Sequence, residues 1–581
     1  MFKNKVIIFF IIVFGLLASR DLLRFGYFPM HDDLQMMRQL ELEKCFLDGQ
    51  VPCRWVPDMG YGFGYPLFNF YPPLPYFIGG IFRVLGFAFT DTAKYTFALS
   101  MILSGVGMYL FARSFFGKVG GFVSAVFYMW APYHALDIYV RGAMNEAWAM
   151  TFFPFVFYTL YKLVTAPSGH IPKWKVLLTL SYAGLFLSHN LMLMIFTPVF
   201  GVWTLFIIWQ KSAYKRLVPI ALAGLWAFGL SAFFTLPAIF ENKYTWIRSQ
   251  LTGYYDYTAH FVSIGQLLFS RYWGYGGSIF GPDDGMAFPI GHIHWLLSIV
   301  GGILALVVMF KNRKAFGSFL KSDSLWPSIL FFFVVGWFVA FLTHSKSIFV
   351  WLAVPQLAYL QFPWRLLTLS TFSFAFIAGV IPALFVLFKK HKNRLLRFFI
   401  SLPQTLLAMI LVFLVVVWNW EFFKVERIGP VTDSEKFSGE AWRLQQTAGI
   451  LDYLPTTAEM APQNQRGVEV EIMTGKGEVS NFSQGTYWAK FDVNLAASSQ
   501  VRLNILYFPG WRVFSNGSEI PVSVPSEEKW GRMWLNLEEG KHTIYAQLFN
   551  TPIRTASNVL SLLSIVALVY FTLFRLKRSK S

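Results

Sequence analysis

The residues best suited to chemistry in this 581-residue sequence are a histidine and two carboxylates in a row, His31, Asp32 and Asp33. They follow an apolar run, residues 6–18, that is long enough with its flanks to enter a bilayer as a helix. Carboxylates close to a membrane surface are costly to desolvate, so an adjacent pair there indicates chemistry or a bound ion. The alternative is structural, in which the pair caps the next helix or lies solvated in a loop. From the motif alone both interpretations stay open.

Further polar residues interrupt apolar runs later in the chain. Arg141 and Glu146 stand at the start of one helical run, His189 lies between two others, and Arg365 opens a fourth. A carboxylate in a first turn complements the helix dipole, and a nearby arginine either pairs with it or grips a phosphate with two hydrogen bonds. A lone histidine is more often structural than catalytic, and an arginine at a helix end can also snorkel. We take these four residues as candidates for substrate or phosphate binding.

Composition places these candidates in a polytopic membrane protein. Hydrophobic residues make up 55% of the chain and charged residues only 14%. Many separate stretches approach the roughly 20 apolar residues that span a bilayer. We therefore expect an integral membrane protein in contact with membrane lipids.

The net charge of +18 reflects topology. Nearly half of the 49 basic residues lie in seven short polar segments, the two termini and five loops, which together hold a single acid, Asp323. Basic segments of this kind stay on the cytoplasmic side of a membrane. The excess therefore predicts orientation and gives no reason to expect a nucleic-acid partner.

The basic segments predict about twelve membrane-spanning helices with both termini in the cytoplasm. We read residues 6–18 as a retained anchor, because no small-residue cleavage site precedes a soluble domain. Residues 74–89 contain Arg83 and three glycines, and are expected to form an interfacial or re-entrant helix on the outer face. The later spans are expected at residues 93–112, 119–132, 146–163, 174–188, 191–209, 217–238, 291–310, 325–342, 364–388, 400–418 and 556–574.

The last long segment between spans differs in kind from the others. It contains strand-length runs of β-branched and aromatic residues, and the dipeptide Asn516-Gly517 is a strong hairpin signal. This pattern predicts a small β-sandwich over about residues 465–550, held outside the membrane. The expected domains are a transmembrane domain with a long first outer loop, an outer β-rich domain, and a final helix with a basic cytoplasmic tail: residues 1–418 with loop 20–92, 419–555, and 556–581.

Both cysteines, Cys45 and Cys53, lie in the first outer loop. A disulfide is permitted there if the loop faces outward. Two free thiols fit the sequence equally well, because spacing alone does not fix the geometry.

Several motifs together resemble a known class. A first helix ending in an Asp-containing outer loop, followed by Pro-Pro-Leu-Pro-Tyr, resembles the GT-C class of polytopic glycosyltransferases. The finer sequence resembles a bacterial membrane family labelled "6-pyruvoyl-tetrahydropterin synthase-related". The motifs that carry the resemblance are residues 31–33, 71–76, 141–146, 188–190, 361–365, 507–511 and 551–554.

The resemblance implies sugar transfer at the outer face of a bacterial plasma membrane. The donor would be a polyprenyl-phosphate-linked sugar, and the acceptor a glycan, a lipid or a protein. In such enzymes a carboxylate of the first outer loop activates the acceptor hydroxyl as a general base, a role that falls to Asp32 or Asp33. Arg141 and Arg365 are positively charged and are expected on the outer side of the membrane, so either could stabilise the departing phosphate.

A divalent metal is compatible with the same residues. Some relatives of this class bind one and others do not. Carboxylate and imidazole groups are suitable ligands, so His31, Asp32, Asp33 and Glu146 are the candidates. The sequence contains no phosphate-cradling Gly-rich loop, no nucleophile elbow and no Cys/His zinc spacing, and we assign no cofactor.

Two other functions remain as alternatives. A transporter or flippase of a lipid-linked glycan would need charged or broken helices near the bilayer midplane and two related halves, and no duplicated half is visible. A scaffold whose β domain binds glycan without catalysis would tolerate substitution of Asp32 or Asp33. We favour the enzyme.

Overall fold

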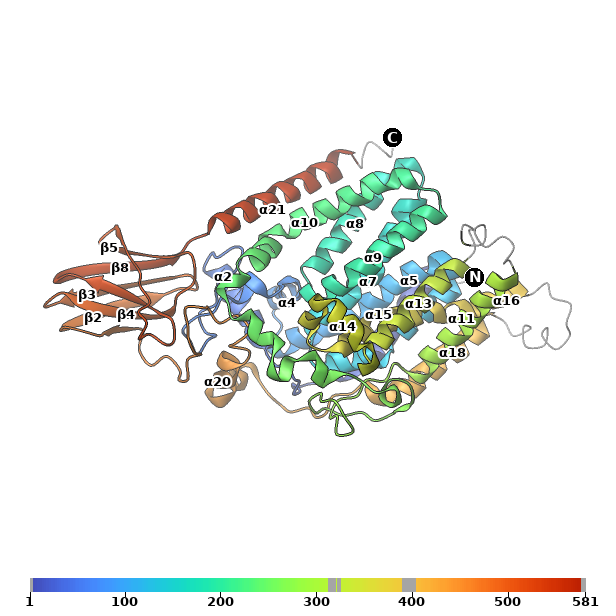
Figure 1. Ribbon diagram of the computed structural model, residues 1–581, viewed down its shortest axis with the longest axis horizontal. Coiled ribbons are helices and arrows are strands. Elements are labelled where there is room, and N and C mark those ends of the chain that lie inside the picture. Colours follow the sequence, from blue (N-terminus) through green and yellow to red (C-terminus); the bar gives the residue numbers. More distant parts are fainter. Residues whose placement is uncertain (1–3, 312–319, 321–324, 389–403, 576–581) are drawn as a thin grey trace.

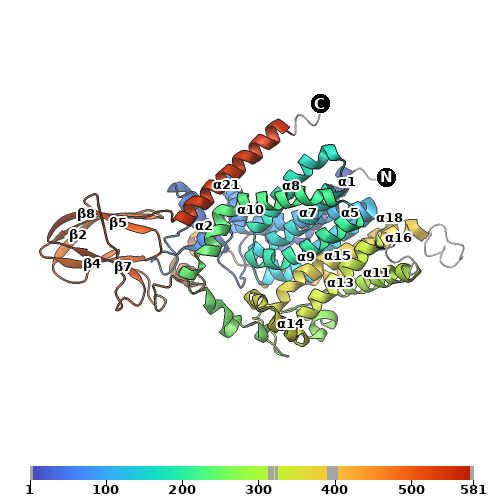
Figure 2. The ribbon, with the colours of Figure 1, turned by 45° about the horizontal axis from the view of Figure 1, so that its top comes forward.

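The computed structural model of the chain describes residues 4–311, 320, 325–388 and 404–575. A bundle of helices occupies most of the molecule, and the antiparallel sheets stand at one end of it (Figure 1). The two ends of the described chain lie toward the opposite end of the bundle (Figure 2). The predicted fold class, a mainly helical membrane protein with a C-terminal β domain, is confirmed.

The predicted spans coincide with helices of the bundle. By length and hydropathy, eight helices of the described residues could cross a membrane, or nine if a bent pair (residues 326–342 and 345–353) forms one span. The expected number of about twelve therefore remains a prediction. The bundle helices are α1 (Asn4–Ala18), α5 (Phe89–Met129), α7 (Met144–Thr165), α8 (Ile171–Phe186), α9 (Asn190–Gln210), α10 (Leu217–Phe240), α11 (His292–Lys311), α13 (Trp326–Leu342), α14 (Ile348–Ala353), α15 (Leu367–Ala378), α16 (Val380–Phe388), α18 (Gln404–Asn419) and α21 (Pro552–Tyr570).

Two expected spans, residues 93–112 and 119–132, share the single element α5. The element is broken at Gly117, whose φ of 71° and ψ of −171° are not helical. Such a backbone conformation is open to glycine and strained for residues with a side chain. The break therefore falls between the two predicted spans.

The first outer loop folds into short helices, α2 (Gln35–Leu47), α3 (Leu67–Phe70) and α4 (Leu74–Val84). An eleven-residue helix such as α4 is about 16 Å long, too short for roughly 30 Å of hydrocarbon. Its length agrees with the expected interfacial position. Cys45 and Cys53 form a disulfide, which settles the alternative that the sequence left open.

The C-terminal domain consists of two antiparallel sheets, as predicted. One has the order β1-β4-β7 and the other β2-β3-β8-β5-β6. Asn516 and Gly517 both have positive φ, 49° and 84°, and join β5 to β6 in the expected hairpin. The strands are β1 (Val470–Ile472), β2 (Gly477–Gln484), β3 (Trp488–Leu495), β4 (Ser499–Leu506), β5 (Trp511–Ser515), β6 (Ser518–Ile520), β7 (Arg532–Leu537) and β8 (Gly540–Leu548).

The segment between α18 and β1 lies against the first outer loop. Gly429 exchanges two backbone hydrogen bonds with Tyr27, each 2.9 Å long. The carboxylate of Asp433 accepts hydrogen bonds from the first backbone N–H groups of α5, Phe89 and Thr90. This segment contains α19 (Asp433–Lys436) and α20 (Gly439–Thr447). Through these contacts it fixes the first outer loop and the start of α5.

Some expected features fall outside the described residues. They include most of the basic loops near residues 311–323 and 389–397, and the tail from residue 576 onward.

Candidate functional site

Asn145 brings three of the sequence motifs together. Its side-chain amide donates one hydrogen bond to the carbonyl oxygen of Pro72 and one to that of Ser188, each 2.8 Å long. Pro72 precedes α4, Asn145 lies in the first turn of α7, and Ser188 precedes α9. Motifs that are far apart in the sequence therefore meet at the same ends of these helices.

The acidic motif lies against the same place through backbone contacts. The amide of His31 donates to the carbonyl of Val140 (3.0 Å), and that of Asp32 to the carbonyl of Arg141 (2.9 Å). Gln35 donates to the carbonyl of Gly142 (2.7 Å). A Cβ at Gly142, where φ is 62°, would collide with Met30, so glycine permits this close approach.

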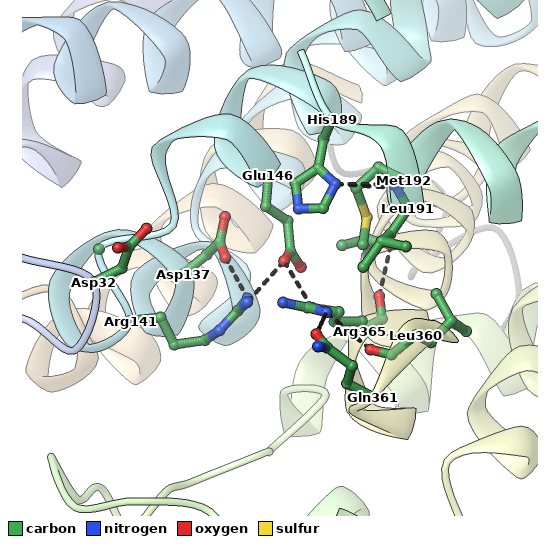
Figure 3. A network of polar contacts seen from close by, with 12 residues as sticks. Asp32, Asp137, Arg141, Glu146, His189, Leu191, Met192, Leu360, Gln361 and Arg365 are labelled. Atoms are coloured by element: carbon green, nitrogen blue, oxygen red, sulfur yellow. Dashed lines mark hydrogen bonds and ion pairs between the residues drawn. The ribbon is translucent and has the colours of Figure 1, made fainter. Parts of the chain in front are cut away.

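Two buried carboxylates and two arginines form the centre of the site (Figure 3). Arg141 reaches Asp137 at 2.5 Å and Glu146 at 2.8 Å. The hydroxyl of Tyr133 donates to the other oxygen of Glu146 at 2.6 Å. Asp137 and Glu146 are both fully buried. Buried ions need partners of opposite charge, and Arg141 and Arg365 supply them to Glu146. Burial raises the pKa of Asp137, although Arg141 opposes that shift.

Arg365 is bound more loosely to the carboxylates than Arg141 is. Its Nε lies 3.7 Å from Glu146, an ion-pair distance beyond a normal hydrogen bond. One terminal nitrogen instead donates to the carbonyl of Leu360 (2.8 Å) and to the side chain of Gln361 (2.9 Å). Its position is thus set largely by the loop that precedes α15.

His189 stands beside Glu146 and caps α9 (Figure 3). Its Nδ1 accepts hydrogen bonds from the backbone N–H groups of Leu191 and Met192. Because Nδ1 is the acceptor, the proton of the neutral ring belongs on Nε2. Burial lowers the pKa of His189 to about 3, although Glu146 acts in the opposite direction. The histidine is therefore neutral near pH 7.

Asp32 is held by an arginine that the sequence reasoning did not single out. Arg38 donates to both of its carboxylate oxygens, at 2.7 and 2.9 Å. The Asp32 side chain is 34% exposed, whereas that of Arg38 is 6% exposed. The carboxylate is thus fixed in direction by a buried partner and still accessible to solvent.

Asp33 has a different partner from Asp32. It forms an ion pair with Lys436 of α19. Burial raises the pKa of Asp33, and the lysine opposes that shift. The ring of His31 contacts the carbonyl of Tyr275 at 2.9 Å. The three adjacent residues of the motif thus contact three different neighbours.

The expected set of metal ligands does not gather. Among the described residues, no three side chains of histidine, cysteine, aspartate or glutamate come together as ligands would. Asp32, Asp33 and Glu146 each pair with a cation, and His31 contacts a carbonyl group. The four residues named as candidate ligands are thus engaged separately.

Two site residues were missed by the sequence analysis, Arg38 and Asp137. Asp137 precedes Arg141 by four residues, a spacing at which helical side chains meet. It is also a lone acid in an apolar run, a signal that could have identified it. Arg38 carries no comparable signal, because its contact with Asp32 depends on how the chain turns into α2.

Fold and site together define a polytopic membrane protein with a polar site at the ends of its helices. Residues 68–281 match a family model described as "6-pyruvoyl-tetrahydropterin synthase related domain; membrane protein", which confirms the expected resemblance over that part of the chain. An uncharacterised protein of Lactococcus lactis subsp. cremoris is 25% identical over 252 residues. That match spans 42% of this chain and 40% of the relative, less than half of either.

Three solved structures are similar to the chain at low identity. The arabinofuranosyltransferase AftD from mycobacteria has a TM-score of 0.44 at 12% identity, over 75% of this chain and 28% of that one. The oligosaccharyltransferase of Archaeoglobus fulgidus has a TM-score of 0.39 at 12% identity, over 77% of this chain and 63% of that one. ArnT from Cupriavidus metallidurans, bound to undecaprenyl phosphate, has a TM-score of 0.33 at 14% identity, over 72% of this chain and 75% of that one. The first two are sugar transferases by name.

Proposed function

We propose that the protein is a membrane glycosyltransferase that transfers a sugar from a polyprenyl-phosphate-linked donor to a glycan, lipid or protein acceptor. The observation that carries this proposal is the buried cluster of Asp137, Arg141, Glu146 and Arg365 beside the accessible carboxylate of Asp32. Intramembrane and membrane-edge charges of this density are costly and mark functional sites.

The reaction would take place at the extracytoplasmic face of a bacterial plasma membrane. In this arrangement both termini are cytoplasmic and the β domain is outside. The position of the sheets, at the end of the bundle away from the two chain ends, supports it (Figure 2). The basic loops of the sequence support the same orientation.

Asp32 is the better candidate for the general base. Both carboxylates are paired with a cation and similarly exposed, 34% for Asp32 and 30% for Asp33. The backbone N–H of Asp32, however, donates to the carbonyl of Arg141, whereas Asp33 is tied to Lys436 of α19. In the proposed step the acceptor O–H gives its proton to the Asp32 carboxylate while the oxygen attacks the anomeric carbon. The bond between that carbon and the phosphate oxygen breaks, and the phosphate leaves with the electron pair.

Arg365 is the better candidate for contacting the leaving phosphate. Arg141 is already committed to Asp137 and Glu146 at short distances. Arg365 lies 3.7 Å from Glu146, and its side chain is 12% exposed. A preorganised guanidinium stabilises the charge that develops on a departing phosphate. In this account Glu146 and His189 orient the two arginines and line the phosphate site.

The test is a donor assay with the purified protein in nanodiscs. A panel of undecaprenyl-phosphate sugars is supplied with candidate acceptors, and the release of undecaprenyl phosphate is measured. We expect turnover with at least one donor, and its loss in Arg365→Met. A parallel assay in sealed liposomes follows movement of the donor across the bilayer. Movement without transfer would contradict the enzyme and establish transport.

A further inference from the structure

Phe362, three residues before Arg365, connects the candidate site to the outer segment between α10 and α11. The guanidinium of Arg365 lies 4.9 Å from the centroid of the Phe362 ring. Two adjacent tyrosines of the outer segment, Tyr254 and Tyr255, also pack edge-on against this ring, with centroids 6.0 and 6.1 Å away. The outer segment thus reaches a residue that contacts Arg365 directly.

The two tyrosines end a short 3₁₀ turn, Gly253–Tyr255. A second turn, Tyr257–His260, follows at once and is capped by the carboxylate of Asp256. The imidazole of His260 contacts the carbonyl oxygen of Tyr254. The backbone on both sides of the second tyrosine is therefore fixed by hydrogen bonds.

Tyr254 faces its own segment of the chain. Its hydroxyl lies over Gly277, where an added Cβ would come within 3.4 Å of it. Burial raises the pKa of Tyr254, and the carboxylate that adds to this shift is Asp284 of the same segment. The first tyrosine thus points away from the candidate site.

Tyr255 faces the candidate site. Burial raises the pKa of Tyr255, the carboxylates of Asp452 and Asp32 raise it further, and Arg365 opposes the shift. Charges shift the pKa of groups that lie near them, so the hydroxyl of Tyr255 is close to both Asp32 and Arg365. All three residues meet solvent: Tyr255 is 37% exposed, and the side chains of Asp32 and Arg365 are 34% and 12% exposed. They therefore border the same open side of the site.

Arg141 separates Asp32 from Arg365 (Figure 3). Its carbonyl accepts a hydrogen bond from the N–H of Asp32, and its guanidinium shares one oxygen of Glu146 with Arg365. In the proposed reaction the acceptor oxygen lies at Asp32 and the phosphate at Arg365, so the sugar occupies the space between them. A side chain close to both groups faces that sugar.

We propose that the ring of Tyr255 packs against the sugar that is transferred and so contributes to the choice of sugar. This inference rests on the proposed function and adds to it a residue that recognises the sugar. A tyrosine combines an apolar ring with a polar edge, and a sugar ring likewise presents both C–H and hydroxyl groups. Ligand sites typically combine aromatic walls with a few convergent polar groups, as Tyr255, Asp32 and Arg365 do.

The test measures how much the sugar adds to the binding of the lipid, and it needs no turnover. The full-length protein in nanodiscs is titrated with undecaprenyl phosphate and with undecaprenyl-phosphate hexoses and pentoses. The affinity for the sugar-bearing lipid divided by that for the sugar-free lipid isolates the sugar contact. A general disturbance of the fold would lower both affinities and leave their ratio unchanged.

Variants of the two adjacent tyrosines locate the contact. Tyr255→Leu removes the ring and should lower the ratio about three- to tenfold, the scale of one aromatic contact. Tyr255→Phe keeps the ring and should keep most of the ratio. Tyr254→Leu is the matched control, because it alters the same turn and the same contact with Phe362 without facing Asp32. Its ratio should equal that of the wild type.

An unchanged ratio in Tyr255→Leu, or an equal fall in Tyr254→Leu, would overturn the proposal. Equal wild-type affinity for the sugar-bearing and sugar-free lipids would overturn it as well. The two levels of inference fail differently. A ratio that falls in Tyr255→Leu alone, in a protein without turnover, would support the sugar contact and count against the transferase. Normal turnover with an unchanged ratio in Tyr255→Leu would support the transferase and overturn the role of Tyr255.

Discussion

Two of the buried arginine–glutamate clusters among the described residues differ in how their carboxylates are satisfied. In the site cluster, Glu146 meets Arg141 closely and Arg365 at 3.7 Å. In the second, which we call the joint cluster, Glu241 and Arg554 are both about 1% exposed. The first borders an accessible carboxylate, and the second is buried throughout.

Both oxygens of Glu241 accept hydrogen bonds. Oε2 accepts from Arg554 at 2.9 Å and from Asn69 at 2.8 Å, and Oε1 accepts from Thr551 at 2.6 Å. Glu241 follows α10, Asn69 lies in α3 of the first outer loop, and Thr551 caps α21. The joint cluster thus ties the helix that returns from the β domain to the helices that carry the site.

The joint cluster also holds a second buried arginine. Arg54 donates to Asn69 at 3.2 Å and to Asn558 at 2.8 Å. Burial and the neighbouring Arg554 lower the pKa of Arg54 to about 9. If the proposed function holds, the same residue types serve structure in one cluster and chemistry in the other. Both oxygens of Glu241 accept hydrogen bonds. Oε2 of Glu146 has ion-pair contacts without a hydrogen bond, and the loosely held Arg365 lies on that oxygen.

The largest expected effect is on stability, at the joint cluster. Glu241→Ala leaves the buried charges of Arg554 and Arg54 uncompensated, so the free energy of unfolding should fall by about 3–5 kcal/mol. Thermal unfolding in detergent measures it. Glu519→Ala, which breaks the half-exposed pair with Arg512, is the control and should lower stability far less, because exposed ion pairs contribute little. An equal decrease in the free energy of unfolding in the two variants would contradict the structural role given to the joint cluster.

The next effect is on donor affinity, at the site cluster. Arg365→Lys keeps the positive charge but loses the forked geometry that engages Leu360, Gln361 and a phosphate. Losing one charged hydrogen bond, about 1.5–3 kcal/mol, should weaken donor binding about 10- to 100-fold. Titration with a polyprenyl-phosphate sugar measures it. Arg554→Lys, assayed per folded molecule, should bind donor as the wild type does. An equal loss of donor affinity in this variant would contradict the distinction between the two clusters.

The smallest effect is a change in pH dependence. The pKa of His189 is about 3 in the folded protein against an ordinary 6.5. The folded state therefore binds fewer protons than the unfolded state below pH 6.5. Stability contributed by the neutral histidine is present above that pH and is lost as the pH falls toward 3.

His189→Asn removes this titration and keeps a good helix cap. Melting temperatures measured from pH 7.5 to pH 4 should decline less steeply in the variant, with little difference at pH 7.5. The other histidines are common to both proteins, so the difference between slopes isolates His189. Parallel slopes would show that His189 titrates normally and is not the buried neighbour of Glu146 described above.

The sequence was sufficient to predict most of the elements and most residues of the candidate site. Apolar runs placed the helices, and Asn516-Gly517 placed a hairpin, because both are local signals. The motifs containing Arg141, Glu146 and Arg365 were chosen because charge in apolar surroundings is costly, and the structure brings these three together.

Pairings between distant segments could not be read from the sequence. Lys436 lies more than 400 positions after Asp33, and nothing local to either residue predicts their contact. The joint cluster likewise depends on α21 returning to α10 after the whole β domain. The disulfide between Cys45 and Cys53, only eight positions apart, was open for a different reason, since spacing alone does not fix how the loop turns.

The central claim is that Asp32 performs chemistry while its neighbour Asp33 holds the loop. The most direct test compares turnover and donor binding in Asp32→Asn and Asp33→Asn, using a donor that the wild type turns over. We predict that Asp32→Asn lowers kcat by about 10²- to 10⁴-fold, the usual contribution of a general base, with donor affinity retained. Asp33→Asn should keep most of the turnover. Wild-type turnover in Asp32→Asn, or loss of turnover in Asp33→Asn alone, would contradict the assignment.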